Sequence, residues 1–291
     1  MKITEYKAFR GPLVAALLAV TSQAWGVSLA EVRWHDEATD TTKIENLIKV
    51  AVSEKDINTR VSKIARAMLE TPYVGHTLEG SPEMLTVNMA EVDCTTFIEV
   101  VAALSRTATH RGGWRDFIDT LEKIRYRGGE LNGYSSRLHY ISEWSLDNGM
   151  RGTIKEVSRE SPRSDYIVKT IDFMTRHREN YVALKDSAEF ARIKNIEAGL
   201  RGHRFCYIKT RDLASKDVIA WIKDGDIVAF VSTLPDLDVT HLGLIVEENG
   251  KKKVLHASSK QKKVVISDEP LADFVKRGGY KGIRVFRVNE D

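Results

Sequence analysis

The chain has 291 residues, of which 42% are hydrophobic, and this is enough to build a core without disulfide bonds. Its formal net charge is +3, and Lys2, Lys7, Arg10 and Glu5 give residues 1–24 a net charge of +2, so the rest of the chain carries +1. A nearly neutral chain without a basic arm argues against a nucleic-acid-binding protein.

The first residues have the pattern of an export signal. Three basic residues precede an apolar run over residues 12–20, and small residues follow at 22–24, the spacing of a cleavage site. The alternative is a membrane anchor, but a spanning helix needs roughly 20 apolar residues and the run is about half that length. We therefore predict a signal peptide over residues 1–24, and an exported protein, periplasmic or secreted, that is not stably inserted in the membrane.

In the first half of the chain apolar residues recur three to four positions apart, which indicates amphipathic helices. The first begins at Ile57, so the exported chain is expected to open with a helix after a polar lead-in, and Thr71-Pro72 ends that helix. Residues 128–133 are expected to form a loop, and residues 144–213 are charged and mixed. The predicted helices lie at about residues 57–69, 95–106, 114–124, 171–174 and 190–196.

After Asp224-Gly225 the hydrophobic pattern changes to the period of strands. The order of elements predicts an α+β fold, with helices first and an antiparallel sheet second. The chain has no internal repeat and no Pro- or Ser-rich linker, which favours one domain over residues 25–291. The predicted strands lie at residues 226–231, 241–247, 252–257, 263–267 and 283–288, with a short helix at 271–277.

Cys94 is the first candidate for chemistry. It follows Asp93, a favourable N-cap residue, and so lies in the first turn of the second predicted helix. The partial positive charge at a helix N-terminus lowers the pKa of a thiol, and the free N–H groups there can hold an oxyanion. The alternatives are a small buried apolar residue, or a disulfide with Cys206, which an oxidising compartment would permit.

A base for Cys94 has to come from elsewhere in the fold, and the chain has eight histidines. His241 begins a predicted strand, and Asn249-Gly250 predicts a two-residue hairpin turn after it. In that register Gly243 faces His256, so the two histidines share a face across a diagonal of roughly 7–8 Å between backbones. Gly243 leaves room between the imidazoles, and a hydrogen bond from His256 would fix the tautomer of His241.

Two other interpretations of these histidines stay open. They are incidental strand residues, or they bind zinc together with Asp238 or Cys94. The chain contains neither an HExxH motif nor paired cysteines at ligand spacing. We predict no metal site and no cofactor.

The order of these residues resembles that of the NlpC-type cysteine peptidases of bacterial cell-wall turnover. The matching motifs are Asp93-Cys94-Thr95-Thr96-Phe97, Thr240-His241-Leu242-Gly243 and Leu255-His256-Ala257-Ser258-Ser259. From about Ile57 to Val288 the chain more closely resembles the N-acetylmuramoyl-L-alanine amidase-like family. This closer resemblance is carried by Thr71-Pro72-Tyr73-Val74, Leu85-Thr86-Val87-Asn88 and residues 133–140, 256–259, 264–267 and 282–285.

The resemblance implies a papain-like core, with N-terminal helices packed on a C-terminal antiparallel sheet and helical additions at about residues 107–213. It implies Cys94 as nucleophile, His241 as base and His256 as orienting residue, with Tyr73 beside the thiol at the oxyanion site. Cys206 lies in a poorly matching region and is expected to be an isolated thiol, because a bridge to Cys94 would block the chemistry.

The segment from Tyr134 to Trp144 resembles the part of the family that shapes the sugar side of the cleft. Its aromatic faces and polar donors suit sugar and carboxylate recognition, and the alternative is a packed corner of the fold. The candidate substrate-binding residues are Tyr134, Arg137, His139, Tyr140 and Trp144.

Members of this family are expected to hydrolyse the amide between the lactyl group of N-acetylmuramic acid and L-alanine. The expected substrates are small soluble muropeptides with a 1,6-anhydro sugar, as in bacterial muropeptide recycling, and the expected partners are such peptidoglycan fragments. One alternative is a γ-D-glutamyl-diamino acid endopeptidase that cuts within the stem peptide. The other is a non-catalytic muropeptide-binding protein on the same fold.

Overall fold

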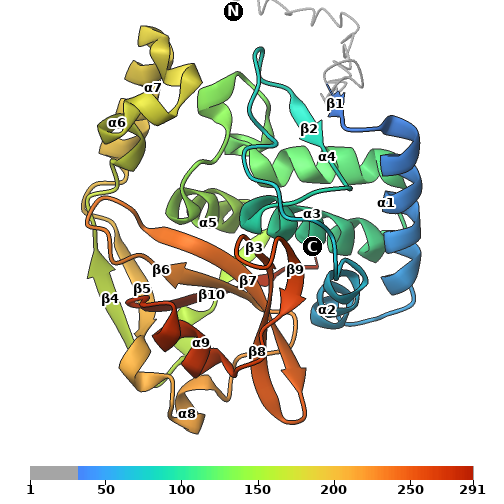
Figure 1. The fold of residues 1–291 in the computed structure, drawn as a ribbon, viewed down its shortest axis with the longest axis vertical. Helices are drawn as coiled ribbons and strands as arrows, with labels where there is room; N and C mark the ends of the chain where they lie inside the picture. Colours follow the sequence, from blue (N-terminus) through green and yellow to red (C-terminus); the bar gives the residue numbers. More distant parts are fainter. Residues whose placement is uncertain (1–31, 291) are drawn as a thin grey trace, which may run out of the picture.

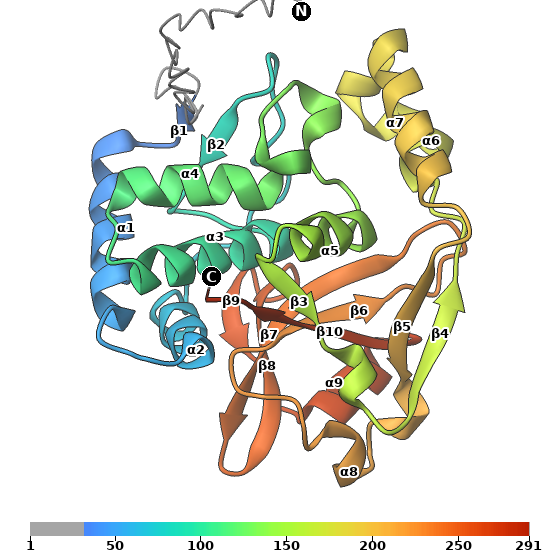
Figure 2. The same ribbon diagram turned by 180° about the vertical axis from the view of Figure 1, so that it is seen from behind.

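The computed structural model describes residues 32–290, so the predicted signal peptide lies outside the described part. A layer of helices covers one face of an antiparallel sheet, and two short helices pack at the opposite face (Figures 1 and 2). The helices are α1 (Glu37–Ala51), α2 (Ile57–Ala67), α3 (Cys94–Thr109), α4 (Trp114–Arg125), α5 (Ile141–Met150), α6 (Phe173–Arg176), α7 (Ser187–Gly199), α8 (Lys216–Ile219) and α9 (Leu271–Arg277).

The main sheet has eight strands in the order β4-β5-β10-β6-β7-β8-β9, and β3 pairs with β10 beside this path. A separate parallel pair joins β1 to β2. The strands are β1 (Val32–Trp34), β2 (Leu85–Val87), β3 (Ile154–Glu156), β4 (Ser164–Val168), β5 (Arg204–Lys209), β6 (Ile227–Val231), β7 (Val239–Glu248), β8 (Lys251–Ser258), β9 (Lys263–Ile266) and β10 (Gly282–Val288).

The alternation of side chains along the strands divides the core between the two faces of the sheet. Leu242, Leu244 and Leu255 pack with α1 to α5 in the larger hydrophobic cluster. Phe230 and Ile245 point the other way and pack with Phe274 of α9. A third cluster joins α6 and α7 to the end of the sheet. Helix α3, which begins at Cys94, therefore packs on β7 from the side of Leu242, whereas His241 lies on the other face of that strand with Ile245.

The predicted α+β class, the antiparallel sheet and all five predicted strands are confirmed, as is the helix at 271–277. The predicted loop at 128–133 begins with a short 3-10 turn, Arg127–Gly129. The expectation that the chain opens with the helix at Ile57 is wrong, because β1 and α1 precede it. Asp36 caps α1 by accepting a hydrogen bond from the Thr39 N–H at 2.8 Å.

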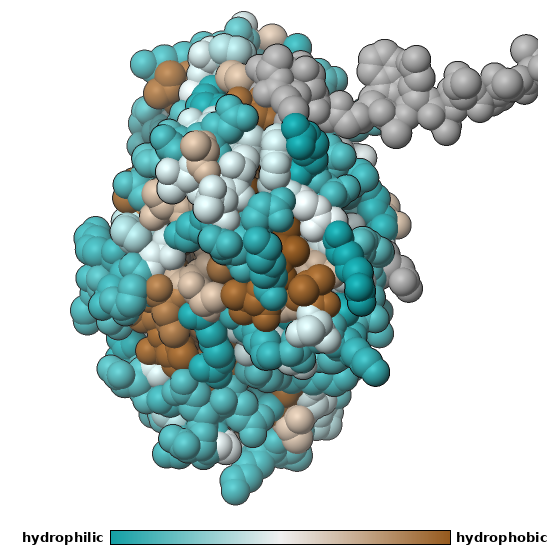
Figure 3. Space-filling view, turned by 90° about the vertical axis from the view of Figure 1, so that its right-hand side faces the viewer, coloured by the Kyte–Doolittle hydropathy of each residue, from teal (hydrophilic) through white to brown (hydrophobic). Residues whose placement is uncertain are grey.

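The expectation of helices first and strands second is also too simple. Strands β3, β4 and β5 come from the mixed region at 144–213 and extend the sheet beyond β10. In residues 32–290 no helix is long and apolar enough to cross a membrane. The face on the side of α1 and α2 is largely hydrophilic, with smaller hydrophobic areas between the polar side chains (Figure 3).

Candidate active site

Cys94 is the first residue of α3, as the sequence predicts. The Asp93 carboxylate caps the helix by accepting hydrogen bonds from the N–H groups of Thr95 at 3.0 Å and Thr96 at 2.8 Å. The Thr96 hydroxyl accepts one from the Asp93 N–H at 2.8 Å, which completes a capping box. Since α3 packs against β7 and β8, the capped end directs the thiol at the strands that carry the histidines.

The predicted hairpin register is confirmed. Glu248 faces Lys251 and Leu244 faces Leu255, so the next pair along is Gly243 and His256. The Nε2 atom of His241 lies 2.8 Å from Nδ1 of His256, and the two rings are nearly perpendicular, at 88°. A Cβ atom on Gly243 would lie 3.3 Å from the Cβ of His256 and 2.6 Å from a methyl group of Val254. A side chain at this position would therefore crowd the strand that carries His256.

Aromatic rings hold both histidines in place. Phe230 of β6 stacks on His241 with ring centroids 5.6 Å apart, and Phe274 of α9 meets the His256 ring edge-on at 5.1 Å. Phe230 also contacts Phe274 at 5.2 Å and Tyr280 at 4.9 Å. Sequence reasoning missed these three aromatic residues, because nothing local distinguishes them from ordinary core positions.

Burial keeps the resting site uncharged. It raises the pKa of the Cys94 thiol to about 11, and the Asp93 carboxylate adds to the rise, whereas hydrogen bonds with the Leu242 backbone and the Thr95 side chain oppose it. Burial also lowers the pKa of His241 to about 3, with His256 adding to the fall, and that of His256 to about 4. The expectation that the helix N-terminus gives a low thiol pKa is therefore wrong for the free protein, because burial and the Asp93 carboxylate raise the thiol pKa.

The neutral histidine pair can still work as a base. If Nδ1 of His241 is to accept the thiol proton, Nε2 must carry a hydrogen and donate it to Nδ1 of His256. That arrangement leaves one unprotonated nitrogen on His241 for the thiol. The same hydrogen bond fixes the plane of the ring, which is the orienting role expected for His256.

Tyr73 lies close to the thiol. Its backbone bridges to Val92 in a parallel pairing, and its N–H donates to the Lys262 carbonyl at 2.9 Å. The ring packs with Cys94 against the larger core cluster. Burial, followed by the nearby charges of Cys94 and Asp93, raises the pKa of the phenol, so its hydroxyl stays protonated and able to donate.

A cavity opens on each side of this constellation. The histidine-side cavity, of about 450 Å³, is lined by residues that include His241, His256, Lys260, Glu269, Arg277 and Tyr280. The cysteine-side cavity, of about 250 Å³, is lined by residues that include Tyr73, Glu79, Asp93, Glu99, Arg137 and His139. Asp93 and Thr95, the sequence neighbours of Cys94, line the cysteine-side cavity, and both histidines line the other, so the candidate residues border both cavities.

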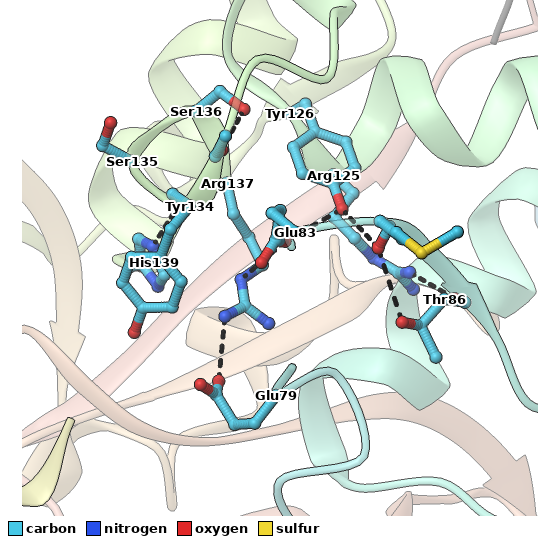
Figure 4. A network of polar contacts seen from close by, with 12 residues as sticks. Glu79, Glu83, Thr86, Arg125, Tyr126, Tyr134, Ser135, Ser136, Arg137 and His139 are labelled. Atoms are coloured by element: carbon cyan, nitrogen blue, oxygen red, sulfur yellow. Dashed lines mark hydrogen bonds and ion pairs between the residues drawn. The ribbon is translucent and has the colours of Figure 1, made fainter. Parts of the chain in front are cut away.

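A buried polar network underlies the cysteine-side cavity (Figure 4). The Arg137 guanidinium donates to Glu79 at 2.8 Å and lies 3.4 Å from Glu83. Behind it Arg125 donates to Glu99 at 2.7 Å, and neither of these two side chains is more than 3% exposed. Arg137 and His139 thus lie at the cavity, as expected for substrate-binding residues.

The other candidate substrate-binding residues do not lie at either cavity. Trp144 is 2% exposed and packs edge-on against Phe286 in the larger core cluster. Tyr140 is 3% exposed, and its hydroxyl donates to Glu197 and accepts from the Met174 N–H. Tyr134 is also buried, and it stacks on His139 with ring centroids 4.5 Å apart. We correct the expectation for Tyr140 and Trp144, because burial leaves them no surface for a ligand, and assign Tyr134 to the support of His139.

The two cysteines are not bonded to each other. Both are free thiols, and Cys206 is buried on β5, paired opposite Tyr166. The disulfide alternative is therefore wrong, and Cys206 is an isolated thiol as expected. Within residues 32–290 no group of three or more His, Cys, Asp or Glu side chains is placed to hold a metal ion.

Comparison with known proteins shows the family. The family model described as AmiA-like, N-acetylmuramoyl-L-alanine amidase-like, matches residues 63–283. The crystal structure of an N-acetylmuramoyl-L-alanine amidase from Bacteroides uniformis is 38% identical, with a TM-score of 0.73, and the match covers 84% of this chain and 99% of that one. The chain belongs to the N-acetylmuramoyl-L-alanine amidase-like family, as its sequence motifs predict.

Two further structures are similar to this chain. A Bacteroides fragilis protein described as a candidate xylanase is 36% identical, with a TM-score of 0.72, over 77% of this chain and 98% of that one. A Legionella pneumophila protein is 20% identical, with a TM-score of 0.68, over 87% of this chain and 95% of that one, and shows a shared fold. The comparison with curated proteins gave no match. Family membership supports an amidase-like hydrolase that acts on peptidoglycan-type substrates.

Proposed function

We propose that the protein is a cysteine amidase that cleaves the bond between N-acetylmuramic acid and L-alanine in muropeptides, on a papain-like core of the NlpC type. The arrangement of three residues carries the proposal. Cys94 begins a capped helix that packs on β7, and His241 of that strand lies 2.8 Å from His256. The family and the amidase of Bacteroides uniformis support the choice of bond.

The proposed reaction has two steps. In the first, the Cys94 sulfur attacks the lactyl carbonyl carbon while His241 accepts the thiol proton, and the Cys94 N–H and the Tyr73 hydroxyl hold the oxyanion. His241 then donates that proton to the alanine nitrogen as the C–N bond breaks. In the second, water attacks the thioester, and His241 takes a proton from the water and returns it to the sulfur. The net change is one amide and one water converted to an acid and an amine.

The raised thiol pKa and the lowered imidazole pKa fit this sequence of proton transfers. In the proposed reaction the neutral thiol transfers its proton to the neutral imidazole only as the sulfur attacks, when the developing charge is stabilised by the carbonyl to which the sulfur adds. His256 remains neutral and keeps the hydrogen bond that orients His241.

We propose that the substrates are small soluble muropeptides with a 1,6-anhydro sugar, and that the protein meets them after export, in the periplasm or outside the cell. Two cavities of about 450 and 250 Å³ suit a compact substrate with one group on each side of the bond. The signal peptide that the sequence predicts over residues 1–24 supports the location.

The first experiment is mass spectrometry of the products formed from defined muropeptides. We expect free anhydro-disaccharide and an intact stem that begins at L-alanine with the wild-type protein, and neither product with Cys94→Ala. Cys206→Ala is the matched control, because it removes the other thiol, which is buried on β5 away from both cavities. It should retain wild-type activity.

Other products would identify the alternatives. A cut after D-glutamate that depends on Cys94 would make the protein an endopeptidase. Binding without any cleavage, unchanged by alkylation of the thiol, would make it a muropeptide-binding protein. Equal cleavage by wild type and Cys94→Ala would contradict the cysteine mechanism.

Glycoside hydrolysis is less well supported by the site. It requires two carboxyl groups free to face the scissile bond. The three carboxylates that line the cysteine-side cavity are engaged within the protein, since Asp93 caps α3, Glu99 pairs with Arg125 and Glu79 pairs with Arg137. We therefore expect no release of sugars from xylan.

A further inference from the structure

We propose that the histidine-side cavity binds the departing stem peptide, with Arg277 as the contact for its carboxylates, and that the cysteine-side cavity binds the uncharged sugar. This inference rests on the proposed function, because it assigns the two halves of that substrate. Three separate observations support the assignment: the direction of proton transfer, the charges lining each cavity and the free edge of the Arg277 guanidinium.

The direction of proton transfer fixes which half of the substrate lies on which side. The imidazole that takes the thiol proton must deliver it to the leaving nitrogen, so that nitrogen has to lie on the side of His241. The carbonyl oxygen has to lie near the donors at Cys94 and Tyr73. His241 and His256 line the histidine-side cavity, whereas Tyr73 lines the other one. The amine product therefore extends into the histidine-side cavity.

The charges of the two cavities agree with this direction. Among the acidic residues and arginines that line the cysteine-side cavity, Glu99 is paired with Arg125 behind it, which leaves two carboxylates, Glu79 and Asp93, and one cation, Arg137. This excess of negative charge repels an acidic stem. It does not repel a sugar whose lactyl carboxyl group forms the amide and so carries no charge. The histidine-side cavity has equal numbers of both signs, given by Lys260, Arg277, Asp268 and Glu269.

Arg277 is arranged to bind a carboxylate. The side chain of its partner Glu269 is 27% exposed and that of Arg277 is 58% exposed, and one oxygen of Glu269 accepts hydrogen bonds from both Nε and Nη2. Among residues 32–290 the Nη1 group has no hydrogen-bond partner, so the edge formed by Nη1 and Nη2 is open to a ligand. Such an edge binds carboxylates in a bidentate manner. Glu269 and the Phe274 ring, 5.6 Å away, hold the guanidinium beside His256.

Arg137 in the cysteine-side cavity is buried between two carboxylates. It is 5% exposed and lies between Glu79 and Glu83, at 2.8 and 3.4 Å (Figure 4). Its charge is therefore neutralised within the protein, and a stem carboxylate there would meet Glu79 first. The two arginines differ in exposure and in the number of carboxylates beside them, so the one on the histidine side is the better contact for an acidic group.

The test compares two substrates on matched variants. The substrates are a muropeptide whose stem carries free carboxylates and the same molecule with those groups converted to carboxamides. We expect wild-type KM to be roughly tenfold lower for the carboxylate form, the size of a charge-assisted hydrogen bond. Arg277→Gln should abolish this preference while kcat changes by less than about twofold. Arg163→Gln is the control, because Arg163 is similarly exposed, at 56%, and also pairs with one carboxylate, Asp212.

A third variant distinguishes the reverse orientation. If the stem instead occupied the cysteine-side cavity, Glu79→Gln would lower KM for the carboxylate form and leave KM for the carboxamide form unchanged. We expect Glu79→Gln to change both by the same factor, because it alters the sugar side. A charge preference that survives Arg277→Gln, or that changes with Glu79→Gln, would overturn the inference.

The same preference can be measured without turnover. Dissociation constants for both substrates on the Cys94→Ala protein, measured by calorimetry, should show the roughly tenfold difference and lose it in the Cys94→Ala, Arg277→Gln double variant. If the wild type does not cleave the substrates but the binding preference is present and depends on Arg277, the result would count against the proposed function alone. Cleavage without that preference would count against the inference alone.

Discussion

Buried ion pairs support the cysteine half of the site, whereas packed aromatic rings support the histidine half. Arg125 and Glu99 behind α3 are almost fully enclosed, with side chains 2% and 3% exposed. Around the histidines, Phe230 and Phe274 make the contacts, and the charged pair Arg277–Glu269 faces solvent. The charges on the first side are thus buried within the fold, while those on the second side are exposed to solvent.

The largest effect is expected from breaking the buried pair. Arg125→Ala leaves the Glu99 carboxylate buried without its partner, and it also removes the hydrogen bond to the Thr86 carbonyl. We expect a loss of about 3–5 kcal/mol in the free energy of unfolding, measured by urea denaturation. Arg163→Ala, which breaks an exposed pair, should cost no more than about 1 kcal/mol. Equal losses would refute the distinction between the two kinds of pair.

Gly243→Ala tests whether packing sets the position of the histidines. The new methyl group would lie 2.6 Å from the side chain of Val254 and 3.1 Å from the Leu255 carbonyl oxygen. We expect the free energy of unfolding to fall by about 1–3 kcal/mol. At 20 °C kcat should fall by more than the fraction of protein that is unfolded accounts for. Gly199→Ala is the control, since nothing lies within 4 Å of its added carbon. Full activity in Gly243→Ala would show that the close approach is not needed.

The neutral state of His256 predicts acid sensitivity. Its pKa is about 4 in the folded protein and about 6.5 when unfolded, so the unfolded chain binds more protons between these values, and stability is lost as pH falls through this range. In His256→Gln the slope of unfolding free energy against pH should be smaller by up to about 1.4 kcal/mol per pH unit. The measurement is denaturant unfolding at pH 7, 6, 5 and 4. An unchanged slope would mean that His256 is not held neutral.

The thiol should be slow to alkylate at neutral pH. With a pKa of about 11, Cys94 is mostly protonated at pH 7, and its reaction with iodoacetamide should accelerate about tenfold per pH unit from pH 7 to 10. The experiment uses Cys206→Ala, so that one thiol reports. An alkylation rate that stays constant from pH 6 upward would indicate a preformed thiolate and imidazolium, contrary to a neutral Cys94 and a neutral His241.

The smallest effect is expected at the solvent-exposed pair of the histidine half. Arg277→Gln removes a partner of Glu269 at the surface, and we expect the free energy of unfolding to change by less than about 1 kcal/mol. Thermal denaturation of the variant beside Arg125→Ala makes the comparison direct. A loss as large as that of Arg125→Ala would make Arg277 a structural residue.

The place of Cys94 at a helix start and of His241 and His256 on one strand face could be predicted because local signals determine both. Asp93 is a strong helix cap, and the turn at Asn249-Gly250 sets the register that brings Gly243 opposite His256. These signals act within a few residues of each other. No long-range information was needed to place the two histidines on one face.

Features that depend on distant contacts could not be predicted in the same way. The stacking of Phe230 on His241 and the pairing of Arg137 with Glu79 and Glu83 join separate elements. The depth of burial of Trp144 likewise depends on the whole core, so its aromatic character was compatible with a binding face. The thiol pKa was predicted in the wrong direction because the helix end is visible in the sequence and the burial around it is not.

Helix α1 is a different case, because its signal is present. Ile44, Leu47, Ile48 and Ala51 have helical spacing and are all buried. The threonines in its first half weaken the pattern, and the clearer periodicity from Ile57 onward obscured it. Strand β5 has four consecutive buried residues, 205–208, and so lacks the alternation that marks strands exposed on one face.

The most direct test of the account is to trap the covalent intermediate. Wild-type protein mixed with an anhydro-muropeptide and quenched in acid within milliseconds to seconds should gain the mass of the sugar acyl group, and peptide mapping should place it on Cys94 as a thioester. Cys94→Ala should gain no mass and form no product, whereas Cys206→Ala should behave like the wild type. Turnover without an adduct on Cys94, together with cleavage by Cys94→Ala, would contradict the central role assigned to this thiol.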